Sequence, residues 1–365
     1  MAASYFRQPR LSREEIRALS TISDELKKFF DRNGEPSLGD FTDVIGSRNG
    51  FLDSVQKSLE RLGPAEDNIE EITVKITVTD GWNADALVAR PSLKSGKTPG
   101  PLIVIYHGGG FIAGTPKSMT ATARGLVRLF DAVVVSATYR LAPEHKFPVG
   151  VNDAYDGLRW IAEHAEELGA DTSKGFIIGG GSAGANFVPV LARRAITEGL
   201  KPDITGQWIA VPVMFQNHTV PSKYREIWMS WEQNKHAVLI NATNADLLFN
   251  YYGISGSDFN SPLFNPLAPG FDVSKLPRAF VQVAGMDLVR DDGIVFSYSL
   301  DDAGVETRLK AYPGVPHTFW SFVPSLKISQ QAVVDIAEGF GWLLGRKISE
   351  DEARKAMFRN QTKTP

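Results

Sequence analysis

The sequence predicts an α/β fold in which helices flank a mostly parallel central sheet. Continuous apolar runs at 102–106 and 133–135 are typical of strands that are buried on both faces of such a sheet. Stretches with helical periodicity, at about 118–130 and 152–167, separate these runs along the chain. Strands that alternate with helices indicate parallel pairing, because a parallel connection must cross over the sheet.

The composition is typical of a globular protein, and the net charge argues against two classes of binding partner. Of the 365 residues, 43% are hydrophobic and 22% are charged, which is ordinary for a chain with a large core. The formal net charge of −3 provides no basic field for nucleic acid or for an anionic membrane, so we expect neither as a partner. The chain has no cysteine, which excludes disulfides, thiolate metal ligands and a cysteine nucleophile.

The first residues carry no recognisable targeting pattern. Residues 1–10 lack the apolar stretch of a signal peptide, and no run approaches the roughly 20 apolar residues of a membrane span. We therefore expect a cytoplasmic protein without a stable membrane anchor.

Residues 1–63 predict a helical segment, which we call the N-terminal arm. Apolar residues recur with helical spacing over 11–30, where Ser12 is a candidate cap, and more weakly over 51–62. A polar loop separates the two stretches. We expect this arm either to cover an edge of the sheet or to help to shape a substrate pocket.

A change of periodicity near residue 69 marks the start of the sheet. Apolar and polar residues alternate over 72–78, the chain turns at Asp80-Gly81, and 86–89 returns as a second strand. A hairpin therefore precedes the buried strand at 102–106.

A glycine run, His107-Gly108-Gly109-Gly110, follows that buried strand directly. Glycines leave backbone N–H groups open to close approach, which the stabilisation of an oxyanion requires. On its own such a run is more often a simple turn. Followed later in the chain by a serine elbow, it indicates an oxyanion site.

The stretch 175–190 contains the strongest candidate for a catalytic residue. An apolar run at 176–178 leads into Gly180-Gly181-Ser182-Ala183-Gly184. This segment, the elbow, matches Gly-x-Ser-x-Gly, the pattern of a serine exposed on a sharp turn from strand to helix. Taken alone, the elbow sequence is also compatible with a turn that has no catalytic role.

A dinucleotide site is a further interpretation of the same window. Gly179, Gly181 and Gly184 fit the glycine pattern of dinucleotide-binding proteins, which also follows a strand and opens a helix. That site needs an acidic residue about 20 positions later at the end of a strand. The nearest candidate, Asp203, lies in a Lys-Pro-Asp loop instead, which weakens this interpretation.

An acid and a histidine follow the last two predicted strands. Asp287 comes directly after the strand in 280–292, although it could equally cap the helix that starts near Asp291. Asp291 and Asp292 are weaker candidates for the acid. His317 lies in a loop rich in proline and glycine, and it alone of the six histidines completes the order serine, acid, histidine.

Three motifs resemble those of the hormone-sensitive-lipase-like carboxylesterases, which have the α/β-hydrolase fold. These are HGGG, YRLAPEHKFP at 139–148 and GGSAGAN, and the resemblance extends from about 69 to 345 and is closest to fungal members. The chain departs from the family at four positions. The family has aspartate, glycine, proline and glycine where this chain has Gly181, Ala185, Leu288 and Thr318.

The resemblance implies a domain organisation with a helical cap. Residues 64–213 and 259–346 form the α/β-hydrolase core, and 214–258 is an insertion that joins the N-terminal arm in the cap. Residues 347–365 form a polar tail that we expect to fray.

The resemblance also implies a carboxylesterase that needs neither metal nor cofactor. Ser182 is the nucleophile, His317 the base and Asp287 the residue that orients the base, while the N–H groups of Gly108, Gly109 and Ala183 bind the oxyanion. The expected partner is a small-molecule ester, and a homodimer is left open. Five aromatic residues are candidates to line the substrate pocket: Phe111, Phe215, Trp228, Trp231 and Phe319.

An alternative function uses the same pocket without ester hydrolysis. The chain would then be a tailoring catalyst of secondary metabolism or a small-molecule receptor. Receptors of this family depart from the triad, typically at the histidine, whereas Ser182, Asp287 and His317 are all present here.

Overall fold

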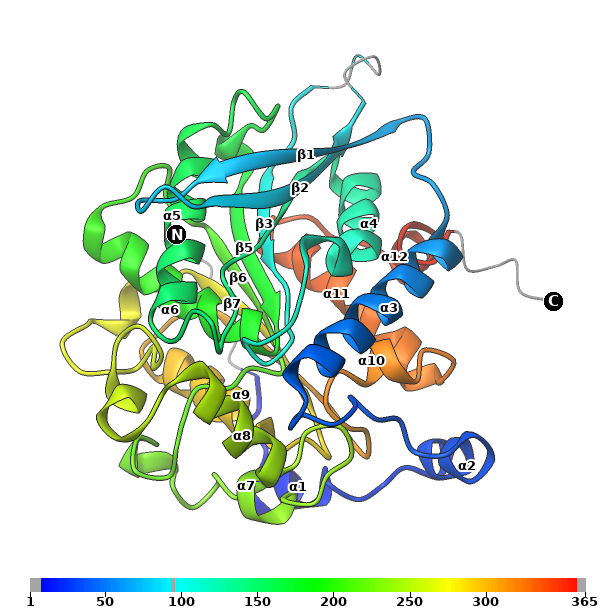
Figure 1. Cartoon of the computed structure of the whole chain (residues 1–365), viewed down its shortest axis with the longest axis vertical. Helices are drawn as coiled ribbons and strands as arrows, with labels where there is room; N and C mark the ends of the chain where they lie inside the picture. Colours follow the sequence, from blue (N-terminus) through cyan, green and yellow to red (C-terminus); the bar gives the residue numbers. More distant parts are fainter. Residues whose placement is uncertain (1–7, 93–95, 97, 360–365) are drawn as a thin grey trace.

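The computed structural model describes residues 8–92, 96 and 98–359. Its strands are β1 (Ile69–Thr77), β2 (Asn83–Pro91), β3 (Leu102–Tyr106), β4 (Val133–Ala137), β5 (Phe176–Gly181), β6 (Gly206–Ala210), β7 (Arg278–Ala284) and β8 (Thr307–Tyr312). Within these residues, the strands form one eight-stranded sheet of order β1-β2-β4-β3-β5-β6-β7-β8 (Figure 1).

Most neighbouring strands of the sheet are parallel. Every neighbouring pair from β4 to β8 is parallel, whereas β2 pairs antiparallel with both β1 and β4. β1 and β2 form the predicted hairpin, in which Val74 lies opposite Ala86. The predicted α/β fold with a mostly parallel sheet is therefore confirmed. Its parallel strands direct their carboxyl ends to one edge, where ligands of such sheets bind.

Helices flank the sheet and lie at its carboxyl edge (Figure 1). None of the helices described is long and apolar enough to cross a membrane. The helices are α1 (Arg13–Ala18), α2 (Asp24–Asn33), α3 (Val44–Leu62), α4 (Thr120–Phe130), α5 (Val149–Glu163), α6 (Ala183–Glu198), α7 (Ser230–Gln233), α8 (Ala242–Tyr252), α9 (Arg290–Asp302), α10 (Phe319–Phe322), α11 (Lys327–Leu343) and α12 (Glu350–Met357).

The side chains of β3 alternate between two hydrophobic layers. Ile103 and Ile105 belong to the layer that contains residues of α4, α11 and α12. Val104 and Tyr106 belong to the layer that contains residues of α5, α6 and α9. The continuous apolar run of this strand therefore reflects burial on both faces, as predicted.

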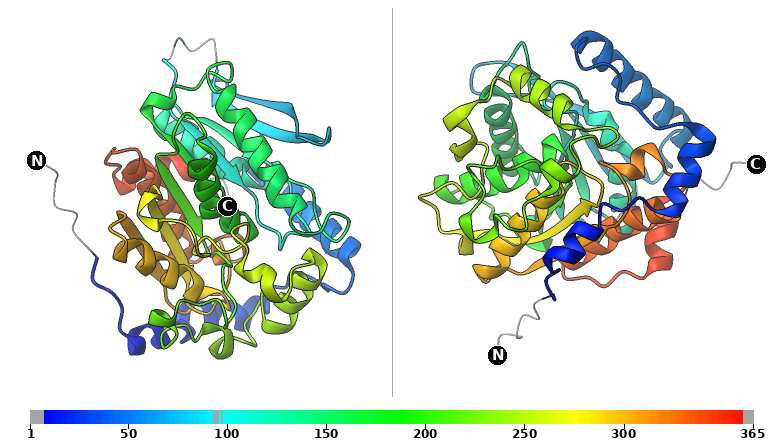
Figure 2. Two further views of the ribbon diagram at one scale, coloured as in Figure 1. Left: turned by 90° about the vertical axis from the view of Figure 1, so that its left-hand side faces the viewer. Right: turned by 90° about the horizontal axis from the view of Figure 1, so that it is seen from below.

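The N-terminal arm is broken where the sequence predicted one helical stretch. α1 and α2 are separated at residues 19–23, and Ser23 caps α2 by accepting the N–H of Leu26. α3 begins at Val44, earlier than the predicted 51, because the Asp43 side chain accepts the N–H of Gly46 and caps the helix there. Figure 2 shows α1, α2 and α3 running along one side of the molecule when it is seen from below.

The prediction that the chain frays from Lys347 is wrong for residues 350–357, which form α12. Ser349 and Glu352 make a capping box at its start, and Ala353 and Met357 are buried with residues of α4. Arg128 of α4 also donates a hydrogen bond of 2.6 Å to the carbonyl of Ala356. The rest of the predicted tail, 360–365, lies outside the described residues.

We expect Met357→Ala to lower the free energy of unfolding by about 2–4 kcal/mol, because it removes a buried side chain and leaves a cavity against α4. Lys355 lies on the exposed face of the same helix, so Lys355→Ala should change stability by less than about 0.5 kcal/mol. Chemical denaturation measures both values. Equal effects of the two substitutions would contradict the packing of α12 on α4.

Candidate active site

Ser182 stands on a strained turn between β5 and α6. Its backbone has φ 55° and ψ −120°, a left-handed φ that is rare outside glycine and that marks local strain. A Cβ atom on Gly180 would lie 2.5 Å from the backbone of Gly184, and one on Gly184 would lie 2.3 Å from the carbonyl of Tyr106. The two glycines of the motif are therefore required by close backbone packing.

The structure brings Ser182, His317 and Asp287 together. His317 Nε2 lies 2.8 Å from Ser182 Oγ, and His317 Nδ1 lies 2.6 Å from Asp287 Oδ2. Asp287 is wholly buried, and His317 is 5% exposed. If Nδ1–H donates to the carboxylate, Nε2 is left to accept the proton of the serine hydroxyl. This arrangement can activate a hydroxyl nucleophile.

The acid and the histidine come from loops that follow paired strands. Ala284 of β7 lies opposite Tyr312 of β8, so 285–290, the acid turn, starts beside 313–318, the histidine loop. The N–H of Met286 also donates to the carbonyl of Val315, at 2.9 Å. The two chains thus remain hydrogen bonded beyond the ends of the strands. This sets the backbone positions from which the side chains of Asp287 and His317 extend.

The oxyanion candidates lie beside the elbow. A Cβ atom on Gly108 would lie 3.2 Å from Ser182 Cβ, so this backbone passes close to the serine. Ala183 is the first residue of α6, where N–H groups have no partner within the helix. Within the described part of the chain, the N–H groups of Gly108, Gly109 and Ala183 donate to no backbone acceptor. They are therefore free to receive an anionic oxygen.

Residues 107–114 contain two of the candidate oxyanion donors and are called the oxyanion loop below. His107, its first residue, anchors the loop to residues 138 and 139. Its Nε2 lies 3.0 Å from the hydroxyl of Thr138, and its ring stacks on Tyr139 with centroids 4.5 Å apart. Burial lowers the pKa of His107 to about 4, although a hydrogen bond to the carbonyl of Gly108 opposes this change. His107 is consequently neutral at neutral pH and serves as a packing and hydrogen-bonding group.

Arg48 of α3 contacts the oxyanion loop, which the sequence did not predict. Its guanidinium donates to the carbonyls of Ile112 and Ala142, each at 2.6 Å. It also pairs with Glu144 of the YRLAPEH motif and, as the largest cause, lowers the pKa of that carboxyl to about 2. Nothing in the local pattern around Arg48 signals these contacts, because they join residues far apart in the chain.

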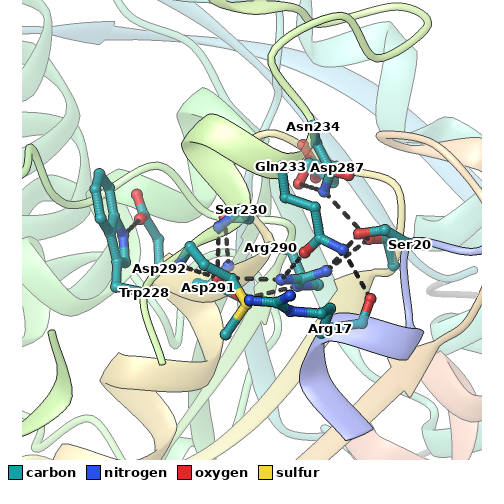
Figure 3. Close-up of polar contacts among 12 residues, drawn as sticks. Arg17, Ser20, Trp228, Ser230, Gln233, Asn234, Asp287, Arg290, Asp291 and Asp292 are labelled. Atoms are coloured by element: carbon teal, nitrogen blue, oxygen red, sulfur yellow. Dashed lines mark hydrogen bonds and ion pairs between the residues drawn. The ribbon is translucent and has the colours of Figure 1, made fainter. Parts of the chain in front are cut away.

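Asp291 and Asp292, the weaker acid candidates, bind groups other than the histidine, and Figure 3 shows Asp291 with Ser230 and Asp292 with Trp228. Asp291 accepts the N–H groups of Met229 and Ser230, at 2.7 and 2.6 Å. Asp292 accepts those of Met214 and Phe215, at 2.7 and 3.1 Å, and the indole N–H of Trp228, at 2.7 Å. Both carboxylates therefore hold the 214–234 segment against the start of α9.

The five aromatic pocket candidates differ in exposure. Phe111, Phe215 and Phe319 are buried in the hydrophobic core, where Phe111 stacks on Tyr252 with centroids 4.0 Å apart. Trp228 and Trp231 are partly exposed and stack on each other at 6.4 Å. The phenylalanines are core positions here, and a pocket-lining role stays a prediction.

Two polar residues near the acid were missed by the sequence analysis. Asn234 donates from Nδ2 to the carbonyl of Asp287 at 2.7 Å, and Arg290 donates to the carbonyl of Gly285 at 3.1 Å. Arg290 belongs to the stretch 280–292 that the sequence analysis identified as carrying the acid, whereas no pattern in the sequence around Asn234 indicates its role. Among the residues described, no group of three or more histidine, aspartate or glutamate side chains could hold a metal ion.

Comparison with known proteins gives consistent matches. Residues 103–321 match the family described as alpha/beta hydrolase fold. AB hydrolase superfamily protein B1A11.02 of Schizosaccharomyces pombe is 36% identical over 80% of this chain and 85% of its own length. Carboxylesterase NlhH of Mycobacterium tuberculosis is 35% identical over 61% of this chain and 67% of its own length. The crystal structure of vibralactone cyclase superposes with a TM-score of 0.81 and 29% identity, covering 94% of this chain and 99% of that one.

We expect Asp292 to make stability depend on pH. Burial raises the pKa of Asp292 from 3.8 to about 7, and its N–H donors oppose the rise only in part. The folded protein therefore keeps a proton that the unfolded chain has already released, so the contribution of Asp292 to stability falls as pH rises from about 4 to about 7. Asp292→Asn cannot titrate, and its thermal midpoint should fall less over this window than that of the wild type.

The matched control is Asp203→Asn, a change at an exposed aspartate. Its curve of thermal midpoint against pH should run parallel to that of the wild type. If Asp292→Asn also ran parallel, the raised pKa of Asp292 would be refuted.

Proposed function

The chain belongs to the alpha/beta hydrolase fold family and is an esterase-type member of it, and from this premise we propose that it is a serine carboxylesterase for a small to medium ester. The resemblance to the hormone-sensitive-lipase-like esterases that the motifs predicted is confirmed by these relatives. The observation that carries the proposal is the position of His317, within 2.8 Å of Ser182 Oγ and 2.6 Å of Asp287.

The proposed reaction proceeds through an acyl-enzyme. His317 Nε2 takes the hydroxyl proton as Ser182 Oγ attacks the ester carbonyl, and Asp287 stabilises the imidazolium that forms. His317 then gives this proton to the departing alcohol. Water, activated by the same histidine, releases the acid and restores Ser182.

The N–H groups of Gly108, Gly109 and Ala183 are the proposed donors to the oxyanion. Their lack of other backbone acceptors within the described residues supports this role. Losing one donor of this kind costs about 3–4 kcal/mol of transition-state stabilisation. The strained φ of 55° at Ser182 supports a nucleophile that is held in place before the substrate arrives.

A second candidate function is acyl chemistry without hydrolysis. The observation in its favour is the similarity to vibralactone cyclase over 94% of this chain. In such a reaction a nucleophile within the substrate, instead of water, would attack the acyl-enzyme. A small-molecule receptor is the remaining alternative, and it requires no reactive serine.

Turnover in water enriched in oxygen-18 separates hydrolysis from the second candidate. A hydrolase incorporates one labelled oxygen into the acid product, because water is the second nucleophile. Mass spectrometry of the products reads this out. An unlabelled cyclic product, formed when a nucleophile within the acyl group attacks the acyl-enzyme and frees Ser182, would instead support an intramolecular reaction.

We expect Ser182→Ala to lower the turnover of p-nitrophenyl acetate by at least about 10⁴-fold, because the nucleophile is removed while the fold is kept. Covalent labelling by a fluorophosphonate should be lost in parallel. Ser173→Ala is the control, since Ser173 precedes β5 at the end opposite to Ser182, and it should keep full activity. Full turnover by Ser182→Ala would refute the proposed nucleophile, and an unlabelled wild type would favour the receptor.

A further inference from the structure

Residues 19–23, between α1 and α2, contact both loops that carry the acid and the histidine. We call this segment the 19–23 turn. The carbonyl of Leu19 accepts the N–H of Gly314 at 2.8 Å, and the N–H of Ser23 donates to the carbonyl of Gly314 at 3.2 Å. The hydroxyl of Ser20 donates to the carbonyl of Gly285 at 3.1 Å. One short segment of the N-terminal arm therefore joins the acid turn to the histidine loop.

The contacts are close enough to require glycine on the opposite side. A Cβ atom on Gly285 would lie 2.1 Å from the carbonyl oxygen of Leu19. A Cβ atom on Gly314, which has a φ of +68°, would lie 2.4 Å from the nitrogen of Ser23. Both loops thus fit the 19–23 turn backbone to backbone, and a displacement of the turn is passed directly to them.

Arg290 fixes the position of Ser20 (Figure 3). Its guanidinium is wholly buried and donates from Nη1 to Ser20 Oγ at 2.7 Å and to the carbonyl of Gly285 at 3.1 Å. Asp291 balances its charge through a contact of 2.6 Å. Gln233 accepts from Arg290 at 3.1 Å and donates to the carbonyl of Arg17 at 2.8 Å, which ties the end of α1 to the same group.

Gly285 and Gly314 lie close in sequence to Asp287 and His317, so their backbone positions limit where those side chains can meet. The hydrogen bond between Asp287 and His317, at 2.6 Å, depends on that meeting point. Activity is sensitive to small errors in such geometry, because a misplacement of about 1 Å can lower rates by about 100-fold.

We propose that the 19–23 turn positions the acid–base pair of Asp287 and His317, and that Ser20 and Arg290 are positioning residues that act through the backbone of Gly285. The inference rests on the proposed function only because that function gives the pair of Asp287 and His317 a catalytic role. None of these positioning groups contacts Ser182, so the expected effect falls on kcat and not on KM.

Three variants of the N-terminal arm test the inference. Ser20→Ala should lower kcat about 3- to 10-fold with KM within about twofold, because one hydrogen bond to the acid turn is lost. Ser20→Thr keeps the hydroxyl and should restore kcat. Ser12→Ala removes the cap of α1, where Ser12 accepts the N–H of Glu15 at 3.2 Å, and should leave kcat unchanged because no contact to either loop is lost.

A second measurement does not require ester turnover. The proton between His317 and Asp287 should give a far-downfield ¹H resonance in the wild type, in Ser20→Thr and in Ser12→Ala, and should move upfield or broaden in Ser20→Ala. If the wild type hydrolyses no ester, the proposed function fails, and this resonance still decides the inference.

The inference is overturned by any of three results. Ser20→Ala could match the wild type in both kcat and the proton resonance. Ser12→Ala could lose as much activity as Ser20→Ala, which would assign the effect to the general stability of α1. Finally, the wild type could lack the downfield resonance, in which case no ordered pair exists for the 19–23 turn to position.

Discussion

The hydrogen bonds of His317 to Ser182 and to Asp287 depend on the parallel pairing of the strands that precede these residues. The acid turn and the histidine loop follow β7 and β8, which are paired up to Ala284 and Tyr312. Ser182 follows β5, farther along the same sheet, and its left-handed backbone turns the hydroxyl toward the histidine. Parallel strands place all three at one edge, so short loops are sufficient to bring them into contact.

Three acidic side chains near the start of α9, those of Asp287, Asp291 and Asp292, are buried and are hydrogen bonded to the surrounding loops. A buried carboxylate is costly unless hydrogen-bond donors surround it. Arg290 of α9 supplies one donor, and further donors come from elsewhere in the chain, namely the backbone of 214–230, the indole of Trp228 and the imidazole of His317. Desolvation therefore makes the acid turn, the 214–234 segment and the histidine loop depend on one another.

The N-terminal arm contacts the carboxyl edge of the sheet at two separate places. Arg48 binds one carbonyl of the oxyanion loop, that of Ile112, and the 19–23 turn binds backbone groups of the acid turn and of the histidine loop. Because these contacts are made to backbone atoms, they constrain loop positions more directly than contacts between flexible side chains would. The geometry at Ser182 is thus set by a segment outside the sheet as well as by the strands.

Local patterns in the sequence were enough to predict the alternation of strands and helices and the elbow at Ser182, and the resemblance to a known family selected Asp287 and His317 as the partners of that serine. The spacing of apolar residues in strands and helices, and a serine between glycines, are properties of residues close together in the sequence. They can therefore be recognised from the sequence alone. Tertiary structure alone decided that Asp287 meets His317 while Asp291 and Asp292 hold backbone, that α12 packs on α4, and that Ser20 and Arg48 reach the loops. Those outcomes depend on which distant groups become buried together, because a donor or a charge acquires its partner only when folding removes water from around it.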